Sequence, residues 1–380
     1  MAIDFAKVPS PCFVLDEHLL EKNLKLIASV KQRAGIEIIL AFKGFAMWGA
    51  FPLVKKYIGS TTASSLNEAR LAKEVFGAPA HTYAPVYTPE DFPGIIESSS
   101  HITFNSLTQF ERFLPAIQQS QKPVSIGLRV NPEYSEVETE LYNPCAPGSR
   151  LGVIAAQLPN KLPPALEGLH FHTLCESKSF DLEKTLEAFE SKFGKYFEQI
   201  KWVNMGGGHL MTHKDYNVEH LISVLTDFRQ RTGLEVILEP GSAFAWQTGY
   251  LVSTIHDIVE NKGIKTAMLD VSFAAHMPDC LEMPYKPRIV GSHFEPQPGK
   301  PSYRMGGNSC LSGDYVGFWS FDQELNVGDQ VIFEDMIHYT MVKTTFFNGV
   351  QHPSIGIWND KTGFRLLREF TFEDYKNKLS

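Results

Sequence analysis

The sequence predicts an α/β fold, a (β/α)8 TIM-like barrel followed by a β-rich C-terminal domain of barrel or sandwich type. Three observations predict it. Short apolar runs alternate with helical patterns through the first two-thirds of the 380 residues. The runs recur at about 29-residue intervals, as in such barrels. Helical periodicity then fades after about residue 245.

Eight short runs are the expected strands, and several of them are β-branched and apolar at consecutive positions, as strands buried on both faces are. They are Ile36–Phe42, Gly59–Ala63, His81–Ala84, Ile102–Phe104, Val124–Val130, Leu166–His172, Lys201–Met205 and Glu235–Glu239. A doubly wound open sheet is the competing interpretation. It would need fewer strands and a glycine-rich turn after the first strand, and AFKGF is not such a turn.

Helical patterns fill the intervals between these runs. Ser65 and Glu68 form a capping box before an apolar helical stripe. Ser106 and Gln109 repeat this pattern one unit later. The remaining helical patterns follow Asp16, a candidate N-cap, and cover Leu182–Ile200 and Val218–Arg231.

Strand-like runs after the barrel are separated by proline and glycine clusters such as PQPGKP, which is typical of a β domain. The runs are Tyr250–Ile258, Thr266–Val271, Arg288–Ser292 and Gln330–Glu334. We therefore expect a barrel over residues 12–245. We expect a β domain over residues 246–380 that also includes residues 1–11.

Composition and charge exclude several classes of protein. The formal net charge is −8, whereas proteins that bind nucleic acid through its phosphates are normally basic. No run of about 18 apolar residues indicates a membrane span. The 5 cysteines are scattered without a CxxC pair, so neither a disulfide framework nor a metal site is expected. Without a signal-peptide pattern, a cytoplasmic protein is expected.

Candidate functional residues lie where the barrel strands end, because barrel enzymes react at the carboxyl ends of their strands. Lys43 directly follows the first strand. A lysine buried at a barrel mouth has a lowered pKa and can form a Schiff base with a carbonyl group. The alternative is an ordinary surface lysine in a turn.

Two glycine loops follow the seventh and eighth strands. Residues 206–208 are all glycine, and Gly241-Ser242 comes after the eighth strand. Exposed backbone N–H groups at these two loops make the phosphate site of many barrels. A tight turn is the alternative for the glycine triplet. Glu239 ends the eighth strand, where a carboxylate holds a heterocyclic nitrogen protonated or forms a salt bridge inside the mouth.

His172 ends the sixth strand, where it could stack on a flat ring or have a structural role. Together with Lys43, Glu239 and the glycine loops it meets the needs of pyridoxal 5′-phosphate (PLP). These needs are an amine for the aldehyde, a phosphate site, a partner for the ring nitrogen and a wall for the ring.

With these residues the chain resembles the alanine racemase-like, fold type III PLP-dependent decarboxylases, and within them the carboxynorspermidine (carboxyspermidine) decarboxylases. Seven segments carry the resemblance, in the family's order and over nearly the whole chain. They are AFKGF, GLHFHTLCE, NMGGGH, EPGSAF, LDVSFAAHMPD, GNSCLSGDY and YTMVKTTFFNGV. The resemblance implies a homodimer with active sites at the interface.

The resemblance also implies residue roles. Lys43 is similar to the Schiff-base lysine, His172 to the residue stacked on the ring, and Glu239 to the partner of the pyridine nitrogen. The implied phosphate binders are Gly207, Gly208, Gly241, Ser242 and Tyr339. Cys310 is similar to the residue that crosses the dimer interface and protonates the substrate carbon after CO2 leaves. Inert packing is the alternative for this cysteine.

The implied substrate-binding residues are Asp270, Tyr285 and Asp314, with Asp314 near the distal amine. A structural cap is the alternative for Asp270. Two departures separate the chain from diaminopimelate and ornithine decarboxylases, which typically read FHxGS and EPGR. Here residues 171–176 read FHTLCE, and Ser242 replaces the arginine. Both departures fit the carboxynorspermidine branch.

The expected activity is decarboxylation of carboxynorspermidine or carboxyspermidine to norspermidine or spermidine, in polyamine biosynthesis. A protonated pyridine nitrogen beside Glu239 favours loss of CO2 over racemisation, since racemases of this fold typically place arginine there. A meso-diaminopimelate decarboxylase and a PLP carrier without turnover remain as alternatives. The two departures argue against the first, and the C-terminal β domain with Cys310 and Tyr339 argues against the second.

Overall fold

The computed structural model describes residues 3–137 and 142–380, and the chain divides into two compact units. The barrel unit contains Asn23–Phe244. The β unit contains Met1–Lys22 together with Ala245–Ser380. Each unit has its own sheet, and each is described separately below.

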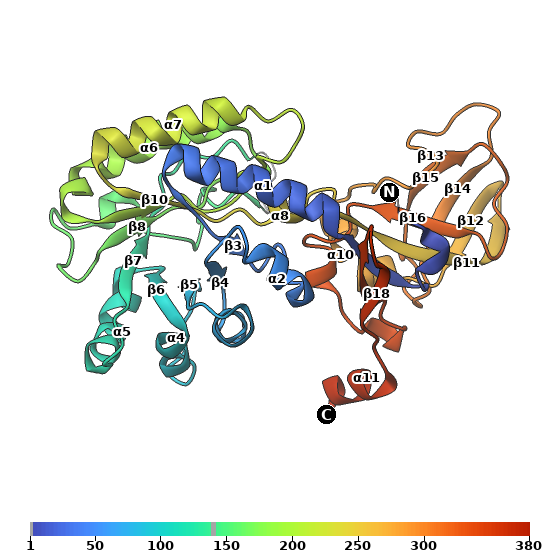
Figure 1. The fold of residues 1–380 in the computed structure, drawn as a ribbon, viewed down its shortest axis with the longest axis horizontal. Coiled ribbons are helices and arrows are strands. Elements are labelled where there is room, and N and C mark those ends of the chain that lie inside the picture. The colour runs from blue at the N-terminus through green and yellow to red at the C-terminus, as the bar shows by residue number, and fades with distance from the viewer. Residues whose placement is uncertain (1–2, 138–141) are drawn as a thin grey trace. The chain divides into compact units, whose positions relative to one another are not determined.

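The barrel unit is built on a parallel sheet that closes on itself (Figure 1). The closure is the parallel pairing of β10 (Glu235–Leu238) with β2 (Glu37–Ile38). Only Ile39 separates β2 from β3 (Leu40–Ala41), and its N–H bonds to Leu238 at 2.9 Å. The two short segments therefore act as one strand of an eight-stranded barrel. This closure confirms the predicted barrel and excludes the open sheet.

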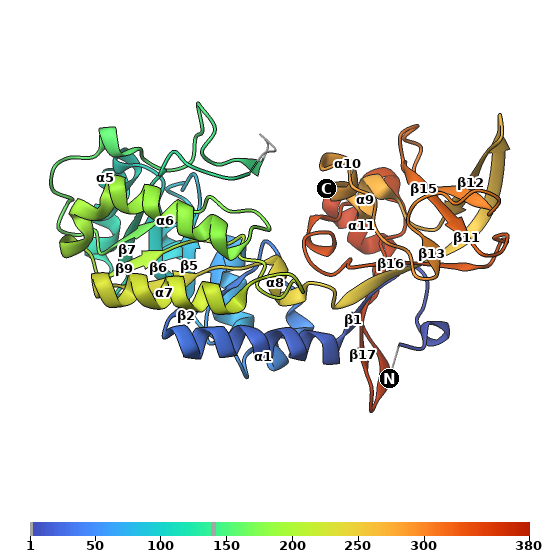
Figure 2. The ribbon, with the colours of Figure 1, turned by 90° about the horizontal axis from the view of Figure 1, so that it is seen from above.

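The other barrel strands overlap the predicted apolar runs. They are β4 (Thr61–Ala63), β5 (Ala80–Tyr83), β6 (Ser99–Phe104), β7 (Ser125–Arg129), β8 (Gly168–His170) and β9 (Trp202–Asn204). The helices are α1 (Glu17–Ala34), α2 (Phe51–Val54), α3 (Leu66–Arg70), α4 (Phe92–Ser98), α5 (Leu107–Gln119), α6 (Ser179–Phe193), α7 (Val218–Thr232) and α8 (Ser242–Ala245). Figure 2 shows α6 and α7 side by side on the outside of the strands.

The predicted caps begin two of these helices. Ser65 Oγ accepts the Glu68 N–H at 3.2 Å at the start of α3. In a capping box the Glu68 side chain accepts the N–H of the capping residue, Ser65. Here Glu68 Oε2 instead accepts the N–H of the preceding residue, Ser64, at 2.6 Å. Ser106 and Gln109 repeat this arrangement at the start of α5. Each serine satisfies a backbone N–H that the helix leaves unpaired.

Trp202 fills the barrel interior at the amino end of β9. It forms a hydrophobic cluster with Ile39 and Ile237. Gly127 and Gly168 make room for the indole, and a Cβ atom on Gly168 would lie 2.0 Å from it. The interior is therefore packed at this level, and polar side chains occupy the opposite, carboxyl end of the strands.

The β unit contains a mixed sheet in the order β13-β15-β14-β12-β11-β1-β17-β18, with β16 also paired to β11. Its strands are β1 (Cys12–Asp16), β11 (Gly249–Asn261), β12 (Ile264–Leu269), β13 (Ser292–His293), β14 (Ser302–Gly306), β15 (Tyr315–Phe321), β16 (Gln330–Glu334), β17 (Ser354–Asn359) and β18 (Gly363–Arg368). Its helices are α9 (Phe273–His276), α10 (Pro278–Glu282) and α11 (Phe372–Leu379).

The first strand of the chain belongs to this sheet. β1 pairs antiparallel with β11 and parallel with β17, so that Cys12 lies opposite both Val252 and Ser354. The division of the structure therefore differs from the predicted one, which begins the barrel at residue 12. The cause is this long-range pairing, which removes all five buried residues of β1 from the barrel.

The predicted strand Arg288–Ser292 is wrong along most of its length. Ile289 makes one isolated bridge with Phe333, and only Ser292 continues into β13. Gly291 interrupts the run with φ 74°, a conformation that a regular strand does not contain. The predicted run Gln330–Glu334, in contrast, coincides with β16 from its first residue to its last.

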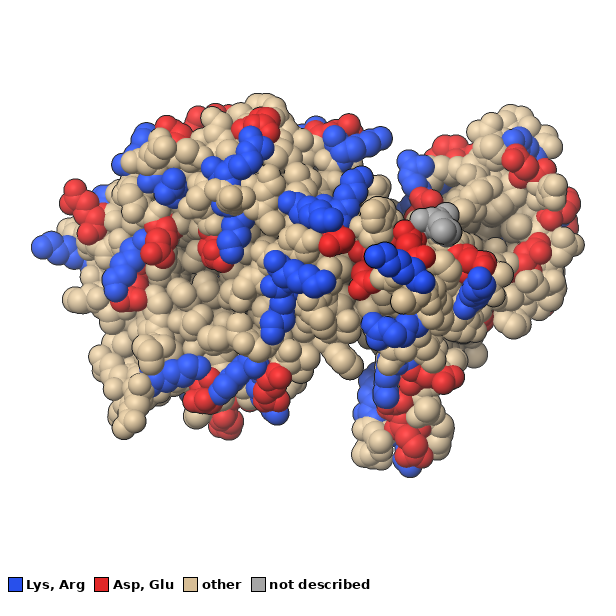
Figure 3. Space-filling model, in the orientation of Figure 1, with Lys and Arg blue, Asp and Glu red and all other residues tan. Residues whose placement is uncertain are grey.

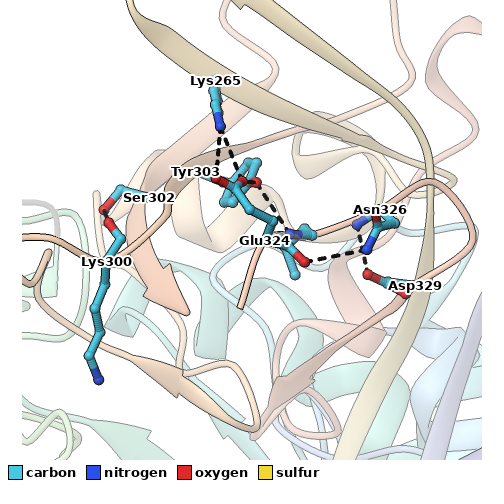
Figure 4. A network of polar contacts seen from close by, with 8 residues as sticks. Lys265, Lys300, Ser302, Tyr303, Glu324, Asn326 and Asp329 are labelled. Carbon is cyan, nitrogen blue, oxygen red and sulfur yellow. Dashed lines mark hydrogen bonds and ion pairs between the residues drawn. The ribbon is translucent and has the colours of Figure 1, made fainter. Parts of the chain in front are cut away.

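A polar network covers one side of the β unit (Figure 4). Lys265 Nζ lies 3.1 Å from Glu324 Oε2, and the Tyr303 hydroxyl donates to the same carboxylate. Asn326 donates its N–H to Asp329 Oδ2 at 2.7 Å. The network fastens the segment before β16 to β12 and β14. Because the Lys265 and Glu324 side chains are largely exposed, their ion pair contributes little stability, although Tyr303 beside them is buried.

Charged side chains of both signs are interspersed on the face seen in Figure 3. The net charge of −8 thus produces no continuous acidic region on that face. Among the helices of residues 3–137 and 142–380, none combines the length and apolar character needed to cross a membrane.

Candidate active site

Seven of the predicted site residues lie at the carboxyl ends of the barrel strands β3, β8, β9 and β10. They are Lys43, His172, Gly207, Gly208, Glu239, Gly241 and Ser242. Direct contacts link several of them. Lys43 Nζ lies 3.3 Å from His172 Nε2, and His172 Nδ1 accepts the Gly207 N–H at 2.8 Å.

These two contacts determine the protonation of Lys43 and His172. Because Nδ1 of His172 accepts a hydrogen bond, the neutral ring carries its hydrogen on Nε2. That N–H can donate to Lys43 Nζ only if the lysine is an uncharged amine. The Gly207 backbone thus orients the imidazole, and the imidazole contacts a nucleophilic amine.

Electrostatics favour the same uncharged state. Solvent reaches Lys43, but protein atoms of the mouth surround it and this desolvation lowers its pKa. The positive charge of Arg129 lowers the Lys43 pKa further, and Glu239 offsets part of the effect. Burial also holds the pKa of His172 well below its ordinary value.

Glu239 is an ionised carboxylate in the mouth, with only 14% of its side chain exposed. Asn204 Nδ2 donates to its Oε1 at 2.6 Å, and His170 Nε2 lies 3.6 Å from its Oε2. Burial by itself raises the pKa of Glu239, but the His170 ring and the Asn204 amide outweigh burial and lower it. The carboxylate can therefore accept a proton-bearing ring nitrogen.

Two further residues shape this carboxylate and were missed as site residues by the sequence analysis. Asn204 ends β9 directly before the glycine triplet, a position that marks it as inward-facing. His170 is 2% exposed, and neither of its ring nitrogens has a hydrogen-bond partner among the described residues. Burial lowers its pKa, so the ring stays neutral behind Glu239.

Arg129 at the end of β7 is a third missed residue. It is 4% exposed, donates to the carbonyl of His172 at 3.1 Å and lies 4.8 Å from the ring centroid of Tyr83. A strand-end arginine that is buried in a barrel was the available sequence signal. Its charge faces the same space as Lys43.

The glycine loops leave no room for side chains, which agrees with the phosphate role predicted for them. A Cβ atom on Gly207 would lie 2.5 Å from the Glu239 carbonyl oxygen and 3.3 Å from the His172 ring. The Cβ of any residue at Gly44 would lie 2.7 Å from Gly241 Cα. Ser242 Oγ lies 3.5 Å from the exposed Glu176 carboxylate, which a phosphate at this hydroxyl would displace. The donor set and the uncharged lysine together fit PLP.

The remaining predicted residues lie in the β unit, where two of them hold a loop. Asp314 is 5% exposed, and its Oδ1 accepts the Ala274 N–H at 2.9 Å while its Oδ2 accepts the Ser309 hydroxyl at 2.6 Å. Cys310 lies in the loop that Asp314 holds, is exposed, and donates its N–H to Asn348 Oδ1 at 2.8 Å. The thiol is therefore accessible, as a proton donor must be.

Asp270 is engaged on both carboxylate oxygens. Its Oδ1 accepts the Thr254 N–H at 2.9 Å, and its Oδ2 accepts the Ser10 hydroxyl at 2.7 Å. Both carboxylate oxygens are thus bonded within the β unit, and the role of Asp270 toward substrate stays a prediction. Tyr285 is 39% exposed, and its hydroxyl donates to the buried carboxylate of Asp279. Tyr339 has φ 46°, a left-handed conformation that is uncommon outside glycine.

This chemistry agrees with the relatives of the chain. A family described as "Pyridoxal-dependent decarboxylase, C-terminal sheet domain" matches residues 12–337. The carboxyaminopropylagmatine decarboxylase of Synechocystis sp. is 54% identical over 98% of this chain and 96% of its own length. The carboxynorspermidine/carboxyspermidine decarboxylase of Campylobacter jejuni is 42% identical over 98% of both chains.

Solved structures show the same fold. The crystal structure of carboxynorspermidine decarboxylase from Campylobacter jejuni complexed with norspermidine matches with a TM-score of 0.91 and 41% identity. The match covers 98% of this chain and 100% of that one. Diaminopimelate decarboxylases are more distant, at 23% identity over 84% of the chain for the Thermoplasma acidophilum protein. The chain belongs to the pyridoxal-dependent decarboxylases.

Proposed function

We propose that the chain binds PLP at the barrel mouth and decarboxylates carboxynorspermidine or carboxyspermidine, releasing norspermidine or spermidine and CO2. One observation carries the proposal. The Lys43 amine, whose pKa is lowered, lies at His172, and the Glu239 carboxylate lies at Asn204 in the same barrel mouth. These are the two groups that PLP needs for its aldehyde and its ring nitrogen. The relatives above support the choice of substrate.

When bound, PLP supplies an aldehyde for amines and a ring that takes up the electron pair left by CO2. Lys43 would bind the aldehyde carbon, His172 would serve as a wall for the ring, and Glu239 would keep a proton on the ring nitrogen. The residues proposed for the phosphate are Gly207, Gly208, Gly241, Ser242 and Tyr339. Only 14% of the Glu239 side chain is exposed, and this limited contact with water strengthens its pull on the ring proton.

Cys310 completes the reaction by donating its thiol proton to the substrate carbon after CO2 leaves. Asp314, Asp270 and Tyr285 are proposed to surround the amine chain of the substrate. The cysteine acts on the site of a second copy, so the working unit is a homodimer, in the cytoplasm. Mixing Lys43→Ala with Cys310→Ala protein tests this sharing. About a quarter of wild-type activity is expected, because half of the random dimers have one intact site. No recovery would contradict shared sites.

A second candidate substrate is carboxyaminopropylagmatine, which the name of the 54% identical relative favours. Its agmatine end is a guanidinium, a planar group with more donors than an ammonium. A diaminopimelate substrate is disfavoured, because the chain has FHTLCE and Ser242 where that group typically has FHxGS and EPGR.

CO2 release distinguishes these substrates. PLP-loaded protein would be offered carboxynorspermidine, carboxyspermidine, carboxyaminopropylagmatine and meso-diaminopimelate in parallel. Release from the first two alone supports the first candidate, and preference for the third supports the second. Main release from diaminopimelate would retain the fold and cofactor but overturn the substrate class. No release at all would overturn the proposed activity.

A further inference from the structure

Asp279, which has no role in the function proposed above, links two distant segments of the β unit. It lies on α10, and its Oδ2 accepts the Tyr285 hydroxyl at 2.7 Å and the Thr340 hydroxyl at 2.8 Å. Thr340 is separated from Asp279 by 61 residues of sequence. One carboxylate oxygen thus fastens the segment after α10 and the turn that follows β16.

The two bonds are of a strong kind. Asp279 is only 9% exposed, and among the described residues no cation pairs with it. Its other oxygen, Oδ1, is buried and has no hydrogen-bond partner within residues 3–137 and 142–380. Burial raises the pKa of Tyr285, and Cys280 and Asp279 add to the effect, so the phenol stays protonated and donates. Hydrogen bonds from hydroxyl groups to a buried carboxylate are stronger than those between neutral groups.

Both fastened segments carry residues that the proposed function uses. Tyr285 itself is 39% exposed although its hydroxyl is bonded, so its ring has a fixed position at the surface of the unit. Thr340 directly follows Tyr339, whose φ of 46° is costly for a residue with a side chain. The Tyr339 carbonyl accepts the Lys343 N–H at 3.0 Å. The bond from Thr340 to Asp279 holds this strained turn from its other side.

We propose that Asp279 is a positioning residue that sets the places of Tyr285 and Tyr339 at once. This inference rests on the proposed function, because it assigns Tyr285 to the substrate and Tyr339 to the cofactor phosphate. Asp279 itself touches neither. Its influence on substrate therefore passes through Tyr285, and its influence on the cofactor passes through Thr340.

The alternative is that Asp279 only stabilises the fold. The two roles differ in what a kinetic experiment measures. Loss of a fold-stabilising bond lowers the melting temperature and leaves the KM of properly folded protein unchanged. Loss of a positioning bond changes KM or cofactor affinity in protein that is still folded.

The experiment compares Asp279→Asn, Tyr285→Phe, Thr340→Val and the double variant Asp279→Asn/Tyr285→Phe. For each, kcat and KM are measured with the carboxypolyamine that the wild-type protein prefers, and PLP affinity is titrated by absorbance. Tyr285→Phe is expected to raise KM about tenfold with kcat nearly unchanged. Thr340→Val is expected to weaken PLP binding about tenfold without raising KM. Asp279→Asn should both raise KM and weaken PLP binding. The double variant should have the same KM as Asp279→Asn alone.

Tyr303→Phe is the matched control. The Tyr303 hydroxyl, on a residue that is also buried, likewise donates to a carboxylate in the β unit, that of Glu324, but this pair belongs to the network of Figure 4 and not to the proposed site. Its KM and PLP affinity should equal those of the wild-type protein. If Asp279→Asn does not fold, Tyr285→Phe and Thr340→Val still remove one hydrogen bond each. A rise in KM for the first and weaker PLP binding for the second would then support the role of Asp279.

Unchanged KM and PLP affinity in these variants, or additive KM effects in the double variant, would overturn the role of Asp279. Wild-type decarboxylation under the same conditions would leave the proposed function intact in that case. Wild-type protein that releases no CO2 from any carboxypolyamine would instead overturn the proposed function, and the role of Asp279 with it.

Discussion

Asn204 Nδ2 lies 2.6 Å from Oε1 of Glu239, and this hydrogen bond joins the ends of β9 and β10 inside the barrel mouth. The amide can donate but brings no charge, so it stabilises the carboxylate without neutralising it. A cation at this position would compete with a ring nitrogen for the same negative charge. An asparagine leaves the full charge available.

Asn204→Asp should therefore impair cofactor binding. Two carboxylates at this distance cannot both be ionised, so the pKa of Glu239 rises and the site loses its hold on the ring proton. We expect at least about tenfold weaker PLP binding at pH 7 and a similar loss of turnover. Absorbance titration with PLP at several pH values measures it. Asn359→Asp is the control, because Asn359 donates to Glu17 within the β unit and should leave PLP affinity unchanged.

The pKa of Lys43 should respond in opposite directions to two substitutions. Arg129 lowers it and Glu239 raises it. Arg129→Gln should thus raise the pH at which Lys43 loses its proton, and Glu239→Gln should lower that pH. Acylation of the apo-protein by a small anhydride, followed at the Lys43 peptide by mass spectrometry, reads the midpoint without PLP. Exposed Lys56 is the internal reference. Shifts in the same direction would contradict this charge arrangement.

Lys43→Ala should abolish covalent attachment of PLP. Among the described residues, Lys43 is the only lysine whose side-chain nitrogen contacts His172. Borohydride treatment of PLP-loaded wild-type protein should fix the pyridoxyl group on the Lys43 peptide. The variant should gain no mass there or elsewhere, whereas Lys56→Ala should behave as wild type. Attachment that persists in Lys43→Ala would remove this lysine from its role.

Cys310→Ala should slow turnover or yield misprotonated product while PLP stays bound. The thiol is exposed and its loop is held by Asp314, so removal of one sulfur should leave the fold intact. Steady-state kinetics together with product analysis by mass spectrometry in D2O measures both effects. Cys145→Ala is the matched control, since Cys145 lies in the barrel unit outside the proposed site. Wild-type rate and product fidelity would contradict the proton-donor role.

His276 should make the β unit sensitive to acid. It is 0% exposed, and burial lowers its pKa to about 3 from an ordinary value of 6.5. The unfolded histidine binds a proton below pH 6.5, whereas the folded one binds it only near pH 3. The contribution of neutral His276 to the free energy of unfolding is therefore fully present above pH 6.5, and it is lost as the pH falls from 6.5 to about 3. The expected slope is about 1.4 kcal/mol per pH unit.

Urea unfolding at several pH values between 4 and 7, monitored by a probe in the β unit, measures this slope. His276→Asn keeps an acceptor for the Ser272 N–H, which the histidine accepts at 3.0 Å, but cannot titrate. The free energy of unfolding of this variant should depend less steeply on pH than that of the wild-type protein. The difference in slope should correspond to about one proton taken up on unfolding. An unaltered slope in His276→Asn would show that other groups govern acid unfolding.

Local features of the fold were predictable where one segment contains the whole cause. Ser65 and Ser106 cap helices because their hydroxyls reach N–H groups three residues away. The run Val218–Arg231 forms α7 because its apolar positions recur at helical spacing. The barrel was predictable because buried parallel strands are apolar throughout and alternate with such helices.

The sequence by itself determined the barrel, the strand ends that bear Lys43, His172 and Glu239, and the glycine loops beside them. Only the tertiary structure decided what those groups do to one another. The pairing of β1 with strands more than two hundred residues away, the protonation of Lys43 and the link from Asp279 to Thr340 all depend on distances between remote segments. Periodicity and motifs report local conformation, whereas hydrogen bonds and charge effects depend on separation in space.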